Sequence, residues 1–328
     1  MRVLVTGGAG FIGSHVVEAF ASGGHQLTVL DDMSTGSRAN LAAAEAGGGV
    51  TVVTGSILDA QLVDDCMREA DACLHLAAAV GMKLVVSRPL AALETNVRGN
   101  DVVIGAAARQ GTRLLFTSTS EVYGRNDEGP LSEGADGVFG SPFRSRWAYA
   151  ISKSFGEALA YAHHREHGSE MVVARLFNVV GPRQTGAYGM VLPSFVAQAL
   201  AGEPLTVFGN GVQSRCFAHV GDVVRALLAL LSHDGAVGNV YNVGGGEEMS
   251  IIELARRVIE RTGSGSEVTF MPYEDAYGDE FEDLWRRRPD TSALERLTGW
   301  RSELTLDQAI DDVIAYARNG RGTLRLAG

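Results

Sequence analysis

The sequence has few cysteines and no long run of apolar residues. Its three cysteines, Cys66, Cys73 and Cys216, are odd in number and form no C-x-x-C pair. Such a set argues against a disulfide framework and is typical of reduced thiols in a cytoplasmic protein. No apolar run approaches the twenty residues of a membrane-spanning helix, and a strand is predicted at the very start of the chain, where a signal peptide would lie. We therefore expect a cytoplasmic protein without a membrane partner.

Positive charge is also scarce. The chain carries 28 lysine and arginine residues against 39 aspartate and glutamate residues, a formal net charge of −11. Nucleic acid and anionic membrane surfaces attract basic proteins, so neither is an expected partner. Three histidines, His163, His164 and His167, stand just before Gly168. We interpret them as the solvated carboxyl end of a helix, and no metal site is expected.

Apolar residues are abundant, at 45% of 328 residues, which favours a large core and two lobes rather than one. Strand and helix patterns alternate over the first 180 residues and predict an α/β fold with a doubly wound parallel sheet, the Rossmann arrangement. Residues 42–49 are interpreted as a loop. Strands are predicted at 2–6, 27–31, 50–54, 72–76, 113–118 and 171–175, and helices at 13–22, 58–70, 89–110 and 147–168.

A glycine-rich turn follows the first predicted strand. Gly7, Gly10 and Gly13 have the spacing G-x-x-G-x-x-G, a partial match to the stricter G-x-G-x-x-G fingerprint. Such glycines let the backbone approach a pyrophosphate, which rests on the amino end of the following helix. Asp31 ends the second predicted strand. An acid there accepts hydrogen bonds from ribose hydroxyls and repels a 2′-phosphate, which favours NAD over NADP.

A second informative stretch ends at Lys153. The strand predicted at 113–118 becomes rich in hydroxyl groups at its end and is followed by Glu121. Tyr149 and Lys153 lie four residues apart, so on a helix they share one face and can serve one ligand. Because the ordinary pKa of tyrosine is about 10, a tyrosine base needs a neighbouring cation, and by spacing Lys153 is that cation.

These features occur with HLAA from His75, Asn96, TSTSEVYG and YAISK, and later with RLFNVVGPR, GEPLTVFGNG, QSRCFAHVGDVV and RRRPD. In this order they resemble the extended short-chain dehydrogenase/reductase family of nucleotide-sugar enzymes, over nearly the whole chain. The resemblance implies bound NAD, a UDP-sugar substrate, and a homodimer paired through the helices predicted at 89–110 and 147–168.

The expected division into domains follows from the change in composition after Gly181, where glycine, proline and short helices begin. Residues 1–180 are expected to form the NAD-binding Rossmann domain, rejoined by about 218–246 through a helix and a buried strand. A smaller, discontinuous α/β lobe, residues 181–217 and 247–328, is expected to hold the nucleotide sugar.

The resemblance also assigns residues to each ligand. Asn178 is expected against the sugar diphosphate, Val207 and Phe208 around the uracil, and Arg215 on a phosphate. Lys83 is either a contact to the substrate carboxylate or cofactor, or an ordinary surface lysine. The full substrate set is Lys83, Asn178, Val191, Val207, Phe208, Arg215 and Arg287. The cofactor set is Gly7, Gly10, Phe11, Ile12, Gly13, Asp31, Ser34, Thr35, Gly36, Ser56, Ile57, Leu76, Ala77, Ala78, Asn96, Thr117, Tyr149 and Lys153.

The reaction expected from the resemblance begins with oxidation of the sugar at C4, with Tyr149 as the base. Family 4,6-dehydratases carry an Asp-Glu pair at the strand tip, and Ser120 stands at the first of those positions, which argues against dehydration. Family 4-epimerases usually have a small or hydroxyl residue where this chain has Glu121. An acid there, in TSEVYG, resembles the UDP-glucuronic acid decarboxylases.

Decarboxylation of UDP-glucuronic acid to UDP-xylose or the UDP-4-keto pentose is therefore favoured, with Thr119, Glu121, Tyr149, Lys153 and Arg287 as the expected catalytic residues. A 4-keto uronate is a β-keto acid, which loses CO2 once the enolate is stabilised. Glu121 has two open roles: to repel the carboxylate or, if protonated, to donate a proton to C5. A UDP-sugar 4-epimerase is the alternative, because RQTGAYGMVLPSFVAQAL resembles epimerases, and a non-catalytic NAD-binding regulator is a third hypothesis.

Overall fold

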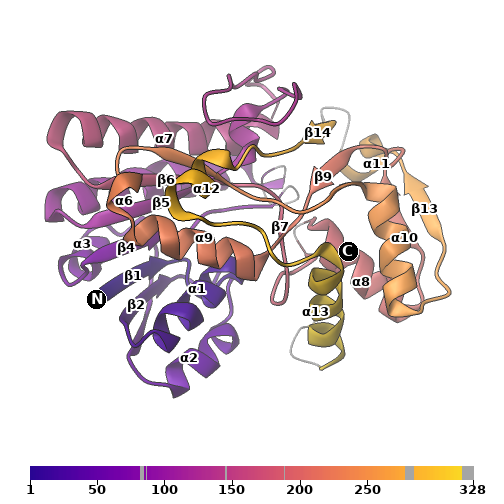
Figure 1. Ribbon diagram of the computed structural model, residues 1–328, viewed down its shortest axis with the longest axis horizontal. Helices are drawn as coiled ribbons and strands as arrows, with labels where there is room; N and C mark the ends of the chain where they lie inside the picture. Colours follow the sequence, from indigo (N-terminus) through magenta and orange to yellow (C-terminus); the bar gives the residue numbers. More distant parts are fainter. Residues whose placement is uncertain (82–84, 86, 145, 188, 278–283, 320–328) are drawn as a thin grey trace.

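The computed structural model describes residues 1–81, 85, 87–144, 146–187, 189–277 and 284–319. Its main feature is a seven-stranded parallel sheet in the order β11-β6-β5-β4-β1-β2-β3 (Figure 1). The order runs outward in both directions from the neighbours β1 and β4, so the sheet is doubly wound and the expected fold class is confirmed. The strands are β1 (Arg2–Thr6), β2 (Gln26–Asp31), β3 (Val50–Thr54), β4 (Ala72–His75), β5 (Arg113–Thr119), β6 (Met171–Leu176) and β11 (Val240–Val243).

Helices cover both faces of this sheet, and the alternation of side chains along each strand explains how. Val3 and Val5 of β1 pack into the core of one face, whereas Leu4 between them packs into the core of the other. Burial on both faces makes these strands nearly continuous apolar runs. One face carries α1 (Phe11–Ser22), α2 (Ala42–Ala46) and α9 (Val220–Ser232), and the other carries α3 (Ala60–Arg68), α6 (Gly99–Gln110) and α7 (Arg146–His167).

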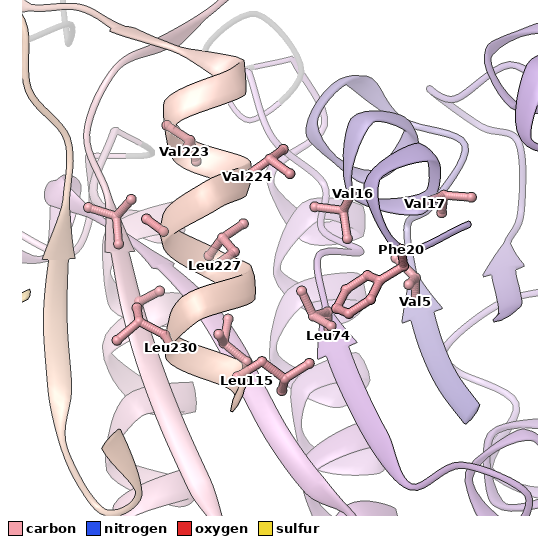
Figure 2. Close-up of a cluster of buried hydrophobic side chains, with 14 of the residues drawn as sticks. Val5, Val16, Val17, Phe20, Leu74, Leu115, Val223, Val224, Leu227 and Leu230 are labelled. Carbon is pink, nitrogen blue, oxygen red and sulfur yellow. The ribbon is translucent and has the colours of Figure 1, made fainter. Parts of the chain in front are cut away.

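Helix α9 returns to the sheet from far along the chain. Figure 2 shows Val224 and Leu227 of α9 facing Val16 and Phe20 of α1, all buried in one apolar cluster. β11, which follows α9, pairs with β6 in parallel from Val240 to Val243. The segment after the first part of the smaller lobe therefore adds one helix and one edge strand to the sheet.

The remaining elements form a smaller α/β lobe with its own apolar core, at the other end of the molecule in Figure 1. β8 pairs with β13 in parallel, while β9 pairs with β12 antiparallel and with β14 in parallel. Capping boxes begin two of its helices, at Ser250 and at Thr305. Its elements are α8 (Val191–Ala201), β8 (Leu205–Phe208), β9 (Ser214–Cys216), β12 (Glu248–Ser250), α10 (Ile251–Thr262), β13 (Val268–Met271), α11 (Tyr273–Tyr277), β14 (Arg286–Arg287) and α13 (Leu306–Arg318).

The structure differs from the sequence-based expectation in two helices. Residues 42–49, expected as a loop, include the short helix α2, whose Ala44 is buried in the core. The helix expected at 89–110 is interrupted by a π-helical turn, η2 (Glu94–Arg98), between α5 (Pro89–Leu93) and α6. Such turns redirect side chains at functional sites, and here the turn carries Asn96. Among the described helices, none has the length and hydropathy of a membrane span.

Candidate active site

A cavity of about 1310 Å³ lies where the carboxyl ends of the parallel strands face the smaller lobe. This is the place where doubly wound sheets bind ligands. Most of the residues expected from the sequence line it, and they come from both lobes. The lining includes Gly7, Gly10, Phe11, Ile12, Gly13, Asp31, Ser34, Thr35, Ile57, Leu76, Ala77, Ala78, Thr117, Thr119, Glu121, Tyr149, Lys153, Asn178, Val191, Phe208, Arg215 and Arg287.

The glycine-rich turn at one end of the cavity leaves no room for side chains. Gly7 has a φ of +70°, and a Cβ there would lie 2.6 Å from the backbone nitrogen of Ala77. A Cβ on Gly13 would collide with the carbonyl oxygen of Gly7. Gly10 is the N-cap residue of α1, and no side chain caps the helix there. The first amide groups of α1 therefore remain available to a phosphate group, so the turn fits the diphosphate of a dinucleotide.

Asp31 lies at the end of β2, on the wall of the same cavity. Its carboxylate accepts hydrogen bonds from the backbone nitrogens of Ala9 at 2.9 Å and Met33 at 2.8 Å. Burial raises the pKa of Asp31, and these two bonds act in the opposite direction. The bonds fix an acidic group where the ribose of a dinucleotide would lie next to the glycine turn, so this end of the cavity fits NAD.

Four of the expected site residues do not line the cavity. Asn96 is buried and holds Ala79, accepting from its nitrogen at 2.8 Å and donating to its oxygen at 3.0 Å, so it shapes the loop after β4. Val207 packs into the core of the smaller lobe, because side chains alternate along β8 and Phe208 takes the cavity side. Gly36 and Ser56 are also absent from the lining. A fifth expected residue, Lys83, lies outside the described residues.

Tyr149 and Lys153 share one face of α7, as their spacing predicts, and both line the cavity. Lys153 is 2% exposed, and its ammonium donates to the carbonyl oxygen of Thr117 at 2.8 Å. Burial lowers the pKa of Lys153 to about 7, against the charge of Glu157, which raises it. Burial and the charge of Glu121 raise the pKa of Tyr149, although a hydrogen bond with Thr119 acts in the opposite direction.

Glu121 is held between two arginines from opposite lobes. Its carboxylate lies 2.8 Å from the Arg146 guanidinium of α7 and 2.5 Å from the Arg287 guanidinium of β14. Arg287 also donates to the Ser120 hydroxyl at 3.2 Å. Burial opposes the charged form of Glu121, but the charges of Arg146, Arg287 and Arg215 outweigh it and lower its pKa to about 2. We call Arg146, Arg287 and Arg215 around Glu121 the arginine cluster.

Sequence reasoning missed Arg146, the member of this cluster that comes from α7. Arg146 lies three residues before Tyr149, so the same helical periodicity that paired Tyr149 with Lys153 also brings it to this face. That spacing could have identified Arg146 from the sequence.

Sequence reasoning also missed Gln213 and Tyr273, which shape the far end of the cavity and have a weaker sequence signal. Gln213 donates to the Tyr273 hydroxyl at 2.7 Å, and the rings of Tyr273 and Phe208 lie 6.4 Å apart.

Comparison with known proteins gives consistent relatives. Residues 3–244 match the family described as NAD dependent epimerase/dehydratase. The chain is 34% identical to the UDP-N-acetyl-alpha-D-glucosaminuronate decarboxylase of Bacillus cytotoxicus, over 97% of this chain and 98% of that protein. It is 35% identical to UDP-glucuronic acid decarboxylase 1 of Xenopus tropicalis, over 97% of this chain and 72% of that protein.

A solved structure has the same fold. The UDP-glucose 4-epimerase of Thermotoga maritima, solved with UDP-glucose, superposes with a TM-score of 0.87 at 29% identity. The match covers 98% of this chain and 100% of that one. Decarboxylases and an epimerase thus share this scaffold, so the reaction has to be argued from the side chains in the cavity.

Proposed function

The chain belongs to the NAD dependent epimerase/dehydratase family and is an enzyme with NAD as its cofactor, and within that family we propose that it decarboxylates UDP-glucuronic acid. The products are UDP-xylose, or the UDP-4-keto pentose if release precedes the return of hydride. The names of the two relatives above, both decarboxylases of UDP-linked uronic acids, support this choice.

The observation that carries the proposal is the pair of arginines that contact Glu121. Arg146 and Arg287 both lie against its carboxylate, and all three side chains are at most 14% exposed. Arginine binds carboxylates well, because its planar guanidinium donates paired hydrogen bonds and stays charged. The C6 carboxylate of a uronic acid is an anion that these arginines can bind, whereas a neutral hexose has none. The two arginines therefore support a uronate as the substrate.

The first chemical step is oxidation of C4, and Tyr149 is the base that we propose for the C4 hydroxyl. Its phenol is hydrogen-bonded with Thr119 and is neutral in this structure. Bound NAD supplies the acceptor for the C4 hydride and a cationic ring that favours the phenolate. Lys153 adds its ammonium to the same face of α7, fixed by the Thr117 carbonyl.

The second step breaks the bond between C5 and C6. With a ketone at C4, CO2 leaves C5 and the bonding electrons move onto the C4 oxygen as an enolate. The enolate then takes a proton from water at C5, which gives the 4-keto pentose. We propose that Arg287 holds the carboxylate before CO2 leaves and that Thr119 donates to the enolate oxygen afterwards. Because the pKa of Glu121 is lowered to about 2, its carboxylate is ionised at neutral pH. That state supports repulsion of the departing carboxylate and argues against proton donation to C5.

A UDP-sugar 4-epimerase is the second candidate. The Tyr149 and Lys153 corner would serve oxidation and reduction at C4 equally well in an epimerase, and the Thermotoga maritima enzyme shares the fold. The arginine cluster separates the two, because C4 inversion of a neutral UDP-hexose makes no use of it.

Three further expectations accompany this proposal. We infer that residues 1–180 with 218–246 bind NAD and that 181–217 with 247–328 hold the nucleotide sugar. The thiols of the three cysteines are free and buried, which supports a reducing compartment such as the cytoplasm.

Exposed apolar side chains on α5 and α7 support a homodimer paired through these helices, namely Leu90, Ile151, Phe155 and Tyr161. Sedimentation is expected to give twice the chain mass, and a monomer would contradict the pairing.

The proposal is tested by incubating the protein with NAD and, in separate reactions, UDP-glucuronate, UDP-N-acetylglucosaminuronate and UDP-glucose. Mass spectrometry of the nucleotide products is expected to show loss of CO2 from UDP-glucuronate, and ¹H NMR, which distinguishes C4 epimers, is expected to show no conversion of UDP-glucose. Loss of CO2 from the acetamido uronate alone would move the substrate to that sugar. Conversion of UDP-glucose or UDP-glucuronate to its C4 epimer, with no change in mass, would overturn decarboxylation in favour of the epimerase.

A further inference from the structure

Three ionisable side chains stand at four-residue intervals on α7. Tyr149, Lys153 and Glu157 lie on the face that meets the end of β5, and each is held there. Tyr149 is hydrogen-bonded with Thr119, Lys153 donates to the Thr117 carbonyl, and the Ser118 hydroxyl donates to Glu157. Consecutive residues of one strand tip therefore fix all three, and the function proposed above uses only the first two.

Burial disfavours the charge of Lys153. Its ammonium lies 4.8 Å from the centre of the Phe116 ring, a contact that favours the cation only modestly, and its hydrogen bond is to a backbone carbonyl rather than to a carboxylate. His75 of β4 is neutral, because burial lowers its pKa to about 3, and Tyr149 is neutral as well. Neither neighbour therefore supplies a negative charge to balance the ammonium.

Glu157 supplies that charge, from a fixed position one turn farther along α7. Its carboxylate accepts three hydrogen bonds from the Arg175 guanidinium of β6, at 2.7, 3.0 and 3.2 Å. Arg175 in turn lies 4.8 Å from the ring of Tyr123, which ends the short 3₁₀ helix η3 (Ser120–Tyr123), and donates to the Glu133 carbonyl. Glu157 is 14% exposed, so solvent screens its effect on Lys153 only weakly.

We propose that Glu157 is a positioning residue that keeps the Lys153 ammonium protonated beside the cofactor and so sets the highest pH at which the site works. The inference rests on the role proposed for Lys153 in oxidation at C4. It does not depend on whether the later step is decarboxylation or epimerisation. Without the Glu157 charge, burial alone would govern Lys153, which would then lose its proton at a lower pH.

The composition of the chain makes a direct test possible, because Lys83 and Lys153 are its two lysines. Protein labelled with ¹³C at the lysine ε-carbon, with NAD bound, should show two side-chain signals, which a Lys83→Arg variant assigns. The pH titration of the Lys153 signal is then compared between the wild type and Glu157→Gln. We expect the midpoint to fall by about one pH unit, together with the alkaline limb of turnover. Glu166→Gln, the same change at an exposed position of α7, should leave both unchanged.

If Glu157→Gln lowers the melting temperature but leaves the titration midpoint of Lys153 unchanged, the proposal is overturned. Glu157 would then be only a structural partner of Arg175. Should Glu157→Gln not fold, Glu157→Asp keeps the charge but moves it away, and a smaller downward shift is expected; no shift would overturn the proposal. The titration involves no turnover, so it holds even if the proposed reaction fails. If the wild-type protein does not decarboxylate UDP-glucuronate but Glu157→Gln still shifts the Lys153 midpoint, only the proposed function is overturned.

Discussion

Two largely buried regions of one cavity have opposite electrostatic outcomes. At the corner formed by Tyr149 and Lys153, burial prevails: the pKa of the phenol is raised and that of the amine is lowered to about 7. At the arginine cluster, charge prevails: the pKa of Glu121 falls to about 2 despite its burial. The difference lies in the number of opposite charges within reach. The corner is suited to a neutral hydroxyl, and the cluster to an anion.

The largest effect should come from removing the phenol of the corner. Tyr149→Phe deletes the proposed base, so turnover of UDP-glucuronate is expected to fall about a thousandfold or more. The change leaves the glycine turn and Asp31 untouched, so NAD content of the purified protein should match that of the wild type. Residual activity above a tenth of the wild-type rate would show that another group takes the proton, and the corner would lose its assigned role.

The next effect should come from the cluster and should depend on the charge of the substrate. Arg287→Met removes one of the two cations on Glu121, and kcat/KM for UDP-glucuronate is expected to fall about a hundredfold, while the Kd of UDP changes little. Arg288→Met is the matched control, because Arg288 is the next residue and its side chain is exposed. Equal losses for the two variants would mean that the triple arginine acts only as a charged surface.

Glu121→Gln should give the smallest of the three effects. Without the repelling carboxylate, CO2 release is expected to slow about tenfold, while UDP-glucuronate binds at least as tightly, because the negative charge beside the substrate carboxylate is removed. Rapid-quench measurement of CO2 separates the two quantities. An unchanged rate of CO2 release would remove Glu121 from the chemical step.

The same variant tests the charge state of Glu121 through stability. Because the pKa of Glu121 is lowered in the folded protein, its stabilising pairing is present at neutral pH and is lost as the pH falls through about 2. The gap in melting temperature between wild type and Glu121→Gln should thus hold from pH 7 to about 5 and narrow below that. A gap independent of pH would contradict an ionised Glu121.

The two regions also differ in how far the sequence predicted them. The corner comes from β5 and α7, and the four-residue spacing of Tyr149 and Lys153 predicted its shared face, as the alternation of strands and helices predicted the sheet. The raised pKa of Tyr149 was not predicted, because spacing along a helix does not say how deeply a side chain is buried. The Lys153 ammonium turned out to bind a backbone carbonyl.

The arginine cluster joins residues far apart in the chain, with Arg287 lying 166 positions from Glu121. Local periodicity carries no information on such pairs, so Arg287 was assigned from resemblance and Arg146 was missed. Val207 was misplaced for a different reason: the motif was found, but the strand alternation that sends Phe208 to the cavity sends its neighbour into the core. The interruption at η2 was equally invisible, since Glu94–Arg98 has no sequence mark of a π-helical turn.

The most direct test of the account follows the sixth carbon itself. UDP-glucuronate labelled with ¹³C at C6 is mixed with the NAD-bound protein, and the label is followed by ¹³C NMR. If the arginine cluster binds a uronate carboxylate for removal, the label leaves the sugar and collects in CO2 and bicarbonate while an unlabelled UDP-pentose accumulates. A label that stays at C6 of a C4-inverted UDP-uronate would contradict the account and leave the oxidising corner as an epimerase site.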